Sequence, residues 1–217
     1  MLIIFLDLET TGIPERSKDQ HYDYKEVDKY PSYKEVDKYP SYKEIDKYKE
    51  SRIVQLAINI GDEKGNIVKT YNFIVKPDGF EIKNSHIHGI TMEMATMTGK
   101  PFVEVIQEIA PLFKKASLLV AHNIKFDKNV LLSELYRYEL LRPINQLLKI
   151  PEFCTCFNTI DIVKMKKYGQ LKPPKLIELY KFLFKKDPVG DLHDAIVDTK
   201  IMAECFYELI RKEYFTL

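Results

Sequence analysis

Residues 2–12 read Leu-Ile-Ile-Phe-Leu-Asp-Leu-Glu-Thr-Thr-Gly, an apolar run that ends in two acids and a turn. A continuous apolar run of this length predicts a buried strand over residues 2–8. Asp7 and Glu9 are two residues apart on that strand, so their carboxylates point to one face of it. Burying two acids costs free energy unless something compensates them, and hard divalent cations prefer several carboxylate oxygens. The pair therefore indicates a metal site, and the alternative is an exposed strand end followed by a turn.

The rest of the chain predicts a mixed α/β domain around this strand. Polar and apolar residues alternate over residues 52–60, and a turn then leads to a partner strand at 67–75. Further strands are expected at 117–121 and 153–157, and helices at 101–115, 126–140, 175–184 and 194–214. Pro111 is expected to kink or shorten the first of these helices. Three strands precede the helices and two alternate with them, which predicts a five-stranded mixed sheet with one antiparallel strand, flanked by helices.

Composition places residues 1–217 in the ordinary globular class and predicts a single domain. Hydrophobic residues make up 45% and charged residues 30%, which excludes collagen-like, wholly disordered and disulfide-scaffold classes. No apolar run is long enough to span a bilayer, and no basic leader precedes the first one. We therefore expect an intracellular protein, cytoplasmic or nuclear, that is not secreted and has no membrane partner. Its three cysteines are expected to be reduced, and Cys154 and Cys156 lack a second pair at zinc-ligand spacing.

Residues 14–51 hold a nine-residue repeat, which we expect to form an inserted, exposed, low-complexity loop. The unit Tyr24–Ser32 recurs at Tyr33–Ser41, and an altered third copy occupies Tyr42–Glu50. Its aliphatic side chains are too few to build a core, and two prolines would interrupt any continuous helix. Tyrosine interleaved with lysine could stack on single-stranded bases. A tolerated insertion in a surface loop is the simpler interpretation, because loop length costs little free energy.

Two further acidic motifs lie where predicted elements meet. Ala121–Asp127 reads Ala-His-Asn-Ile-Lys-Phe-Asp and leads from a strand into a helix, where α/β sheets bind ligands. His193–Asp198 reads His-Asp-Ala-Ile-Val-Asp and opens the last helix. Asp127 and Asp198 each also fit the simpler role of an acid at a helix N-terminus. His193, in the preceding loop, is suited to general-base catalysis because imidazole titrates near neutrality.

The three motifs together predict a two-metal centre for phosphoryl transfer. It would contain one histidine and four carboxylates, namely His193, Asp7, Glu9, Asp127 and Asp198. Carboxylate clusters without zinc-type ligands select Mg²⁺ or Mn²⁺. Two such ions about 3.5–4 Å apart can clamp the attacking and departing oxygens of an in-line displacement at phosphorus.

These motifs resemble those of the DEDD superfamily of 3′→5′ exonucleases. Phe5–Gly12, Ala121–Asp127 and His193–Asp198 occur in the family's order, and the histidine resembles that of the histidine branch, which includes epsilon-type proofreading subunits. The segment Ile87-His-Gly-Ile-Thr91 also resembles a family segment. The resemblance covers nearly the whole chain outside residues 14–51. It implies a ribonuclease H-like fold, with both metal ions held by the four carboxylates and Asp127 acting partly through water.

The resemblance also implies a reaction and its substrate contacts. His193 would deprotonate the attacking water, and the 3′-terminal nucleotide would lie near Thr10 and Ile13, with His88 and His122 as further candidates. For His88 a simple surface-loop role is the alternative. We expect phosphodiester hydrolysis from the 3′ end of single-stranded nucleic acid, with DNA favoured and nucleoside monophosphates released. The alternatives are an exoribonuclease acting on short RNA or RNA 3′ ends, and a catalytically decayed nucleic-acid-binding module.

A free-standing enzyme is expected, since no polymerase partner is indicated. The oligomeric state is left open by the sequence. The net charge of +1 hides a basic segment, because residues 164–186 hold eight lysines and one glutamate, a local charge of +7. A solvated helix face explains this simply. Leading into the His193 loop, the segment could also guide a phosphate backbone, with affinity that falls as salt rises.

Overall fold

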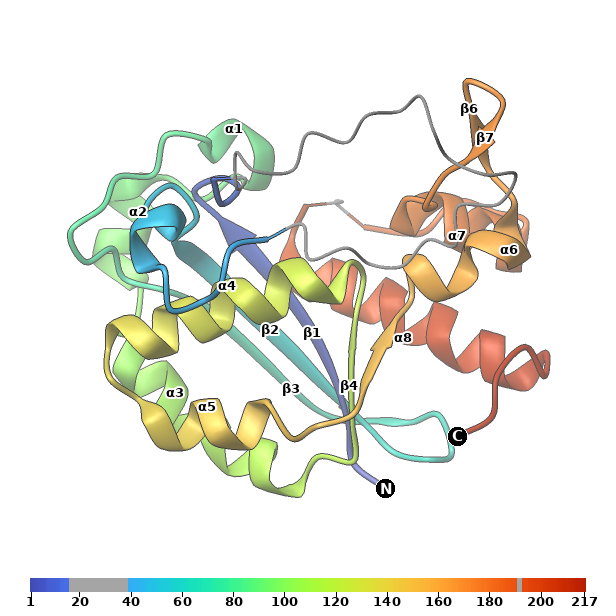
Figure 1. Cartoon of the computed structure of the whole chain (residues 1–217), viewed down its shortest axis with the longest axis horizontal. Coiled ribbons are helices and arrows are strands. Elements are labelled where there is room, and N and C mark those ends of the chain that lie inside the picture. The colour runs from blue at the N-terminus through green and yellow to red at the C-terminus, as the bar shows by residue number, and fades with distance from the viewer. Residues whose placement is uncertain (16–38, 191–192) are drawn as a thin grey trace.

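A five-stranded sheet forms the centre of the molecule (Figure 1). The structure is a computed structural model that describes residues 1–15, 39–190 and 193–217. The strands are β1 (Ile3–Thr10), β2 (Ile53–Gly61), β3 (Ile67–Ile74), β4 (Leu118–Ala121) and β5 (Glu152–Cys154), in the spatial order β3-β2-β1-β4-β5. β2 runs antiparallel to β1 and β3, whereas β4 and β5 run parallel to β1. The predicted mixed sheet with one antiparallel strand is therefore confirmed.

Helices cover both faces of the sheet, with α4 across one face and α8 along the other (Figure 1). The α-helices are α1 (Ser85–His88), α2 (Met92–Thr98), α3 (Phe102–Lys115), α4 (Ile124–Arg137), α5 (Leu141–Leu147), α6 (Ile160–Val163), α7 (Leu176–Phe184) and α8 (Ala195–Arg211). Two 3₁₀ helices, η1 (Ile45–Tyr48) and η2 (Phe157–Thr159), and a small hairpin of β6 (Lys166–Lys167) and β7 (Gln170–Leu171) complete the described elements. No helix in these described parts is long and apolar enough to cross a membrane.

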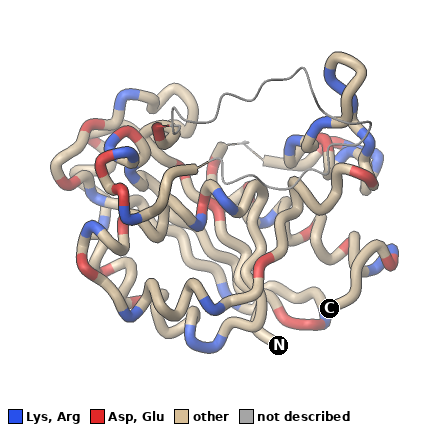
Figure 2. Tube along the Cα trace, viewed as in Figure 1, with Lys and Arg blue, Asp and Glu red and all other residues tan. Residues whose placement is uncertain are grey.

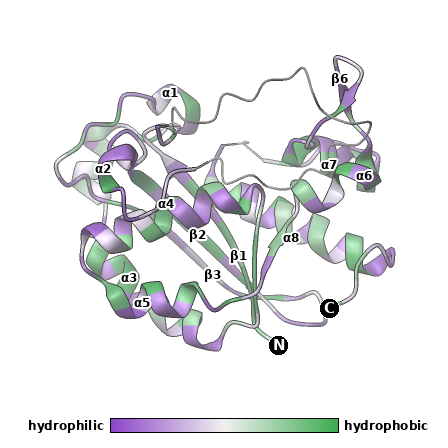
Figure 3. Ribbon diagram, in the orientation of Figure 1, coloured by the Kyte–Doolittle hydropathy of each residue, from purple (hydrophilic) through white to green (hydrophobic). Residues whose placement is uncertain are grey.

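β1 lies at the centre of the core because its apolar run is covered on both faces. Its residues 3–6 are fully buried, and Figure 3 shows hydrophobic residues concentrated in the central strands. The Phe5 ring makes edge-on contacts with Phe206 and Tyr207 of α8, each at 5.5 Å between ring centroids. Edge-on aromatic pairs add about 0.5–1.5 kcal/mol to the free energy of area burial. The strand that ends in the two acids is thus fixed in position.

The observed elements differ from the predicted ones in several places. α3 runs through Pro111 to Lys115, so of the two effects expected of Pro111, a kink or a shortening, the shortening is wrong. Pro111 is exposed in the last turns, and burial of Phe113 against the core holds that end helical. The strand predicted at 153–157 is the shorter β5, because its pairing with β4 ends at Cys154. α5 and the β6–β7 hairpin were not predicted at all.

The third copy of the repeat and the end of the second pack against α4, where an exposed loop was expected. Tyr48 is fully buried and its hydroxyl donates to the Pro40 carbonyl oxygen at 2.6 Å. The hydroxyl of Tyr39 accepts a hydrogen bond from Asn123 Nδ2 at 3.1 Å, and its ring packs against Phe126. Tyrosines therefore supply the apolar contacts that the few aliphatic residues could not. Residues 16–38, with the first copy and most of the second, lie outside the described residues.

Candidate active site

β1 carries Asp7 and Glu9 to its carboxyl end, on the face that is covered by α8. Both side chains are partly buried, and the register of β1 against β2 shifts just after Glu9. The chain then turns sharply, with the Thr10 hydroxyl donating to the Gly12 carbonyl oxygen at 2.7 Å. A Cβ at residue 12 would lie 2.6 Å from the Glu50 carbonyl oxygen, so this close approach requires glycine. The Thr-Thr-Gly sequence thereby sets the direction of the chain beyond the two acids.

α4 brings Asp127 to the same place from the next strand along the sheet. β4 lies parallel to β1 and ends at Ala121, so both strands end at one edge of the sheet. Asn123 then takes the left-handed conformation (φ 74°), which turns the chain into α4. Asp127, in the first turn, is 3% exposed. Its carboxylate accepts backbone hydrogen bonds from Leu8 and from its own residue, which lower its pKa against the stronger opposing effect of burial.

α8 contributes Asp198, and the residue before the helix cap contributes His193. The backbone N–H of His193 donates to Asp198 Oδ2 at 3.4 Å, and His193 has a left-handed backbone (φ 70°). Potential ligand atoms of Glu9, His193 and Asp198 all lie within 4.8 Å of one another. The structure therefore brings together groups that are more than 180 residues apart in the sequence. Residues 191–192, in the loop that leads to His193, lie outside the described residues.

The electrostatics of this acid cluster (Asp7, Glu9, Asp127 and Asp198) oppose ionisation. Burial raises the pKa of Asp7 well above its ordinary value, and the neighbouring Asp127, Asp198 and Glu9 raise it further. Burial, with Asp198 and Asp194 nearby, raises the pKa of Glu9 from 4.5 to about 8. Burial also raises the pKa of Asp127 and of Asp198. Burial thus makes all four acids harder to ionise, and neighbouring carboxylates add to this effect, as expected where carboxylates share a buried site.

The side-chain contacts of the acid cluster fit a divalent metal ion. Asp198 Oδ1 is buried and has no hydrogen-bond partner among the residues that the structure describes. An unpaired buried carboxylate oxygen is costly, and a bound cation would satisfy it. Several carboxylate oxygens converging at one point are the donor set that Mg²⁺ and Mn²⁺ prefer. The four acids could hold such ions, and the imidazole of His193 lies close enough to Glu9 and Asp198 to act at the same point.

Gln55 supports the site from β2, and the sequence analysis missed it. All nine residues of β2 are buried, so its polar positions face the protein interior. Gln55 lies opposite Glu9 and donates from Nε2 to Asp194 Oδ1 at 2.8 Å, while its Oε1 accepts from the Ala195 N–H at 3.2 Å. It therefore fixes the N-terminus of α8, from which Asp198 projects. The available signal was a long polar residue directly across from an acid in a buried strand.

The remaining predicted residues fall into two groups. Thr10, Ile13 and His88 lie around the turn after β1: Ile13 is 65% exposed, whereas Thr10 and His88 are buried. Asn84 joins two of them, because its Nδ2 donates to the Thr10 carbonyl oxygen at 2.8 Å and its Oδ1 lies 3.3 Å from His88 Nε2. These three residues border the carboxyl end of β1.

His122 is engaged by the protein itself. Its Nδ1 lies 3.0 Å from Thr155 Oγ1 and its Nε2 lies 3.0 Å from the Pro174 carbonyl oxygen. Burial lowers the pKa of this imidazole to about 4. With both ring nitrogens committed, His122 joins the end of β4 to the segment before α7, and no ring nitrogen is left for a substrate.

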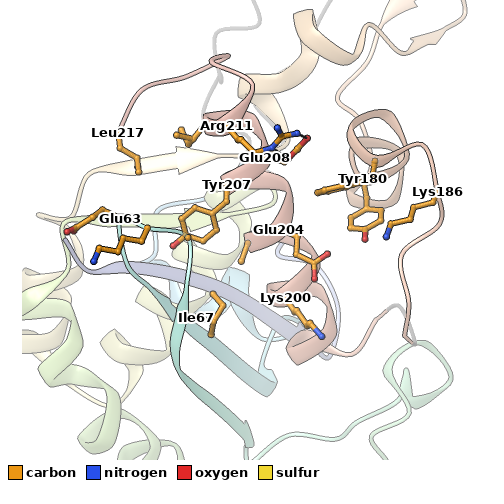
Figure 4. A pocket seen from close by; sticks show the side chains of 15 residues that line it. Glu63, Ile67, Tyr180, Lys186, Lys200, Glu204, Tyr207, Glu208, Arg211 and Leu217 are labelled. Atoms are coloured by element: carbon orange, nitrogen blue, oxygen red, sulfur yellow. Dashed lines mark hydrogen bonds and ion pairs between the residues drawn. The ribbon is translucent and has the colours of Figure 1, made fainter.

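A groove of about 610 Å³ lies along the outer side of α8 (Figure 4). Its Glu63–Gly65 turn follows Gly61, which pairs with Ile3 at the start of β1. That part of the groove is therefore at the end of the sheet opposite Asp7. Its charges are mixed, and Glu208 is paired with Arg211. The groove thus combines acidic and basic side chains and lies away from the acid cluster.

Comparisons with known proteins agree with this geometry. A family model described as Exonuclease (RNase_T) matches residues 4–206. The chain is 26% identical over 178 residues to Exonuclease DPD1, chloroplastic/mitochondrial, of Arabidopsis thaliana, a match that covers 74% of this chain and 51% of that protein. The chain therefore spans about half the length of this curated relative.

Solved structures share the fold. E. coli Exonuclease I in complex with a dA16 oligonucleotide has a TM-score of 0.65 at 16% identity, over 97% of this chain and 41% of that one. Exonuclease X in complex with 5′ overhanging duplex DNA has a TM-score of 0.57 at 21% identity, over 99% of this chain and 94% of that one. The expected ribonuclease H-like architecture is thereby confirmed.

Proposed function

We propose that this chain, which belongs to the exonuclease (RNase_T) family, is a metal-dependent 3′→5′ exonuclease of the histidine branch. It would release nucleoside monophosphates from single-stranded ends, with DNA favoured. The observation that carries the proposal is the approach of Glu9, His193 and Asp198 to within 4.8 Å of one another, with Asp7 and Asp127 near enough to interact electrostatically and a buried Asp198 oxygen left unpaired.

In this proposal each residue of the site has a separate task. Asp7, Glu9 and Asp198 hold two Mg²⁺ or Mn²⁺ ions, and Asp127 completes the site. When bound, the ions supply charge stabilisation for the attacking and leaving oxygens of an in-line displacement. His193 takes the proton of the attacking water, a role that suits an exposed imidazole close to Glu9 and Asp198. Gln55 holds the N-terminus of α8 against β2, which keeps Asp198 and His193 close to Glu9.

The 3′-terminal nucleotide would lie against the turn after β1. Ile13 offers an exposed apolar side chain there, and Thr10 and His88 shape the backbone around it. DNA is favoured because similar folds have been solved with a dA16 oligonucleotide and with 5′ overhanging duplex DNA. We place the activity inside the cell, because all three cysteines are free thiols, which persist in reducing compartments.

Product analysis on end-labelled strands tests this function. With Mg²⁺, a 5′-labelled single strand should shorten as a ladder, while a 3′-labelled strand should release labelled mononucleotide at once. Matched DNA and RNA strands measure the sugar preference, since 2′-OH recognition depends on local shape. Release of mononucleotide from the 5′ end, or internal cuts first, would overturn the polarity. Binding of strands without any cleavage would favour the decayed binding module instead.

A further inference from the structure

The β6–β7 hairpin presents a tyrosine that the fold does not bury. Tyr168 at its tip is 94% exposed. Tyr168 (φ 53°) and Gly169 (φ 81°) are both left-handed. Hairpin turns of this kind favour Asn-Gly, because a bulky residue is strained at positive φ. Tyrosine at the tip therefore costs backbone strain and gains no core contact, which points to a role outside folding.

Exposed lysines lie in this hairpin and just before it. Lys164, Lys166 and Lys167 are exposed, and none of them forms an ion pair within residues 1–15, 39–190 and 193–217. Lys167 Nζ lies 5.4 Å from the centroid of the Tyr168 ring. Figure 2 shows Lys and Arg residues on the projecting hairpin and near its base. The tip thus combines an aromatic face with free positive charge.

The base of the hairpin is fixed at the active-site end of the sheet. The Lys172 N–H donates to the Met165 carbonyl oxygen at 2.9 Å, and Lys172 Nζ pairs with Glu178 of α7. Pro174, two residues further on, is held by His122 at the carboxyl end of β4. Since β4 and β1 end at the same edge, the hairpin projects from the edge that carries the acid cluster (Figure 1).

We propose that this hairpin binds the single strand whose 3′ end is held at the acid cluster. The Tyr168 ring stacks on a base, and Lys166 and Lys167 contact phosphates upstream of the scissile bond. The inference rests on the proposed exonuclease function and adds a second contact to it. Aromatic stacking beside positive charge is how proteins bind single strands without reading their sequence. Tyr168 therefore contributes affinity for long substrates rather than chemistry.

Binding of a fluorescent strand of about 20 nucleotides, longer than the ~4–16-nucleotide footprint of single-strand binding folds, tests the proposal. The full chain is titrated with Ca²⁺ in place of Mg²⁺ so that the strand stays intact. Tyr168→Asn, which suits the left-handed backbone, should weaken binding about tenfold by loss of stacking. Tyr168→Phe keeps the ring and should bind like the parent. The matched control is Tyr214→Asn, a 44%-exposed tyrosine beyond α8, which should leave affinity unchanged.

A salt titration separates the lysines from the ring. Each phosphate contact on a single strand contributes about 0.7 to the slope of log affinity against log salt, so Lys166→Gln with Lys167→Gln should reduce that slope by about 1.4. The hairpin contact is overturned if Tyr168→Asn binds the strand as tightly as the parent and the double lysine variant keeps the parent's salt slope. If the parent binds the strand but does not shorten it with Mg²⁺, while Tyr168→Asn binds it more weakly, the exonuclease function fails and the hairpin contact stands.

Discussion

Asp127 and Glu134 lie on the same helix at nearly equal burial, yet their surroundings are opposite. They are seven residues apart on α4, two turns along one face, and are 3% and 2% exposed. Both carboxylate oxygens of Glu134 accept hydrogen bonds from the Arg52 guanidinium. Asp127 has other acids as its neighbours, with Asp7 and Glu9 close by. Burial alone therefore does not distinguish the candidate site from the rest of α4, whereas burial without a cationic partner does.

The paired region, around Arg52 and Glu134, supports the unpaired region, which is the acid cluster. The Thr11 N–H donates to the Arg52 carbonyl oxygen, and the Arg52 N–H donates to Thr11 Oγ1, both at 2.9 Å. The Arg52 guanidinium also lies over the Phe80 ring at 4.5 Å. The ion pair with Glu134 thus joins α4 to the turn that follows Glu9. The Arg52–Glu134 ion pair therefore holds this end of β1 in place beside acids that have no cationic partner among the described residues.

Removing an acid from the unpaired region should have the largest effect, and it should affect activity alone. Asp7→Asn is expected to reduce the exonuclease rate by at least ~10²–10³-fold, because it removes a carboxylate that would hold the metal ions whose positive charge stabilises the transition state. Its melting temperature in EDTA should not fall, since repulsion between carboxylates is relieved. Rate measurements and thermal melts check both points. A variant that cleaves as fast as the parent would remove Asp7 from the site.

Removing an acid from the paired region should instead affect stability. Glu134→Gln leaves Arg52 buried without its partner, which is expected to lower the free energy of unfolding by about 3–5 kcal/mol. Urea unfolding measures this loss. A change below about 1 kcal/mol would mean that Arg52 finds another partner, and the contrast between the two regions would then be weaker than the structure indicates.

The sequence predicted the acids of the candidate site better than the residues that hold those acids in position. Asp7 and Glu9 were predictable because a two-residue spacing on an apolar run fixes their direction. Gln55 was not, because the pattern of β2 does not reveal that α8 covers its polar face. Likewise the packing of Tyr48 depends on α4, which is distant in the sequence. Local periodicity predicts elements, whereas contacts between elements decide which polar or aromatic residues are buried.

The pH dependence of stability should distinguish the regions in the absence of metal. The pKa of Glu9 is 4.5 in an unfolded chain and about 8 in the fold. The stability linked to protonated Glu9 is therefore complete below pH 4.5 and is lost as pH rises to about 8. Melting temperatures in EDTA should fall over this range, and Mg²⁺ should reduce the fall. A Glu9→Gln variant that shows the same fall would assign it to other groups.

A smaller effect on activity is expected from Gln55, which holds the N-terminus of α8 beside β1. Gln55→Leu leaves Asp194 and the N-terminus of α8 without their partner, so kcat should fall about 10–100-fold with KM little changed. Gln55→Glu, which has the same length but cannot donate from its ionised carboxylate, should also be impaired. Steady-state kinetics on one labelled strand provide both constants. A rise in KM alone would make Gln55 a substrate contact rather than a positioning residue.

Calorimetric titration of the EDTA-stripped protein with Mn²⁺ tests the central claim most directly, because it needs no substrate. The account predicts two Mn²⁺ ions bound per chain in the parent and in folded Glu134→Gln. It predicts weaker binding or a lower stoichiometry in Asp7→Asn and Asp127→Asn. Equal Mn²⁺ binding by the parent and by both aspartate variants would contradict it.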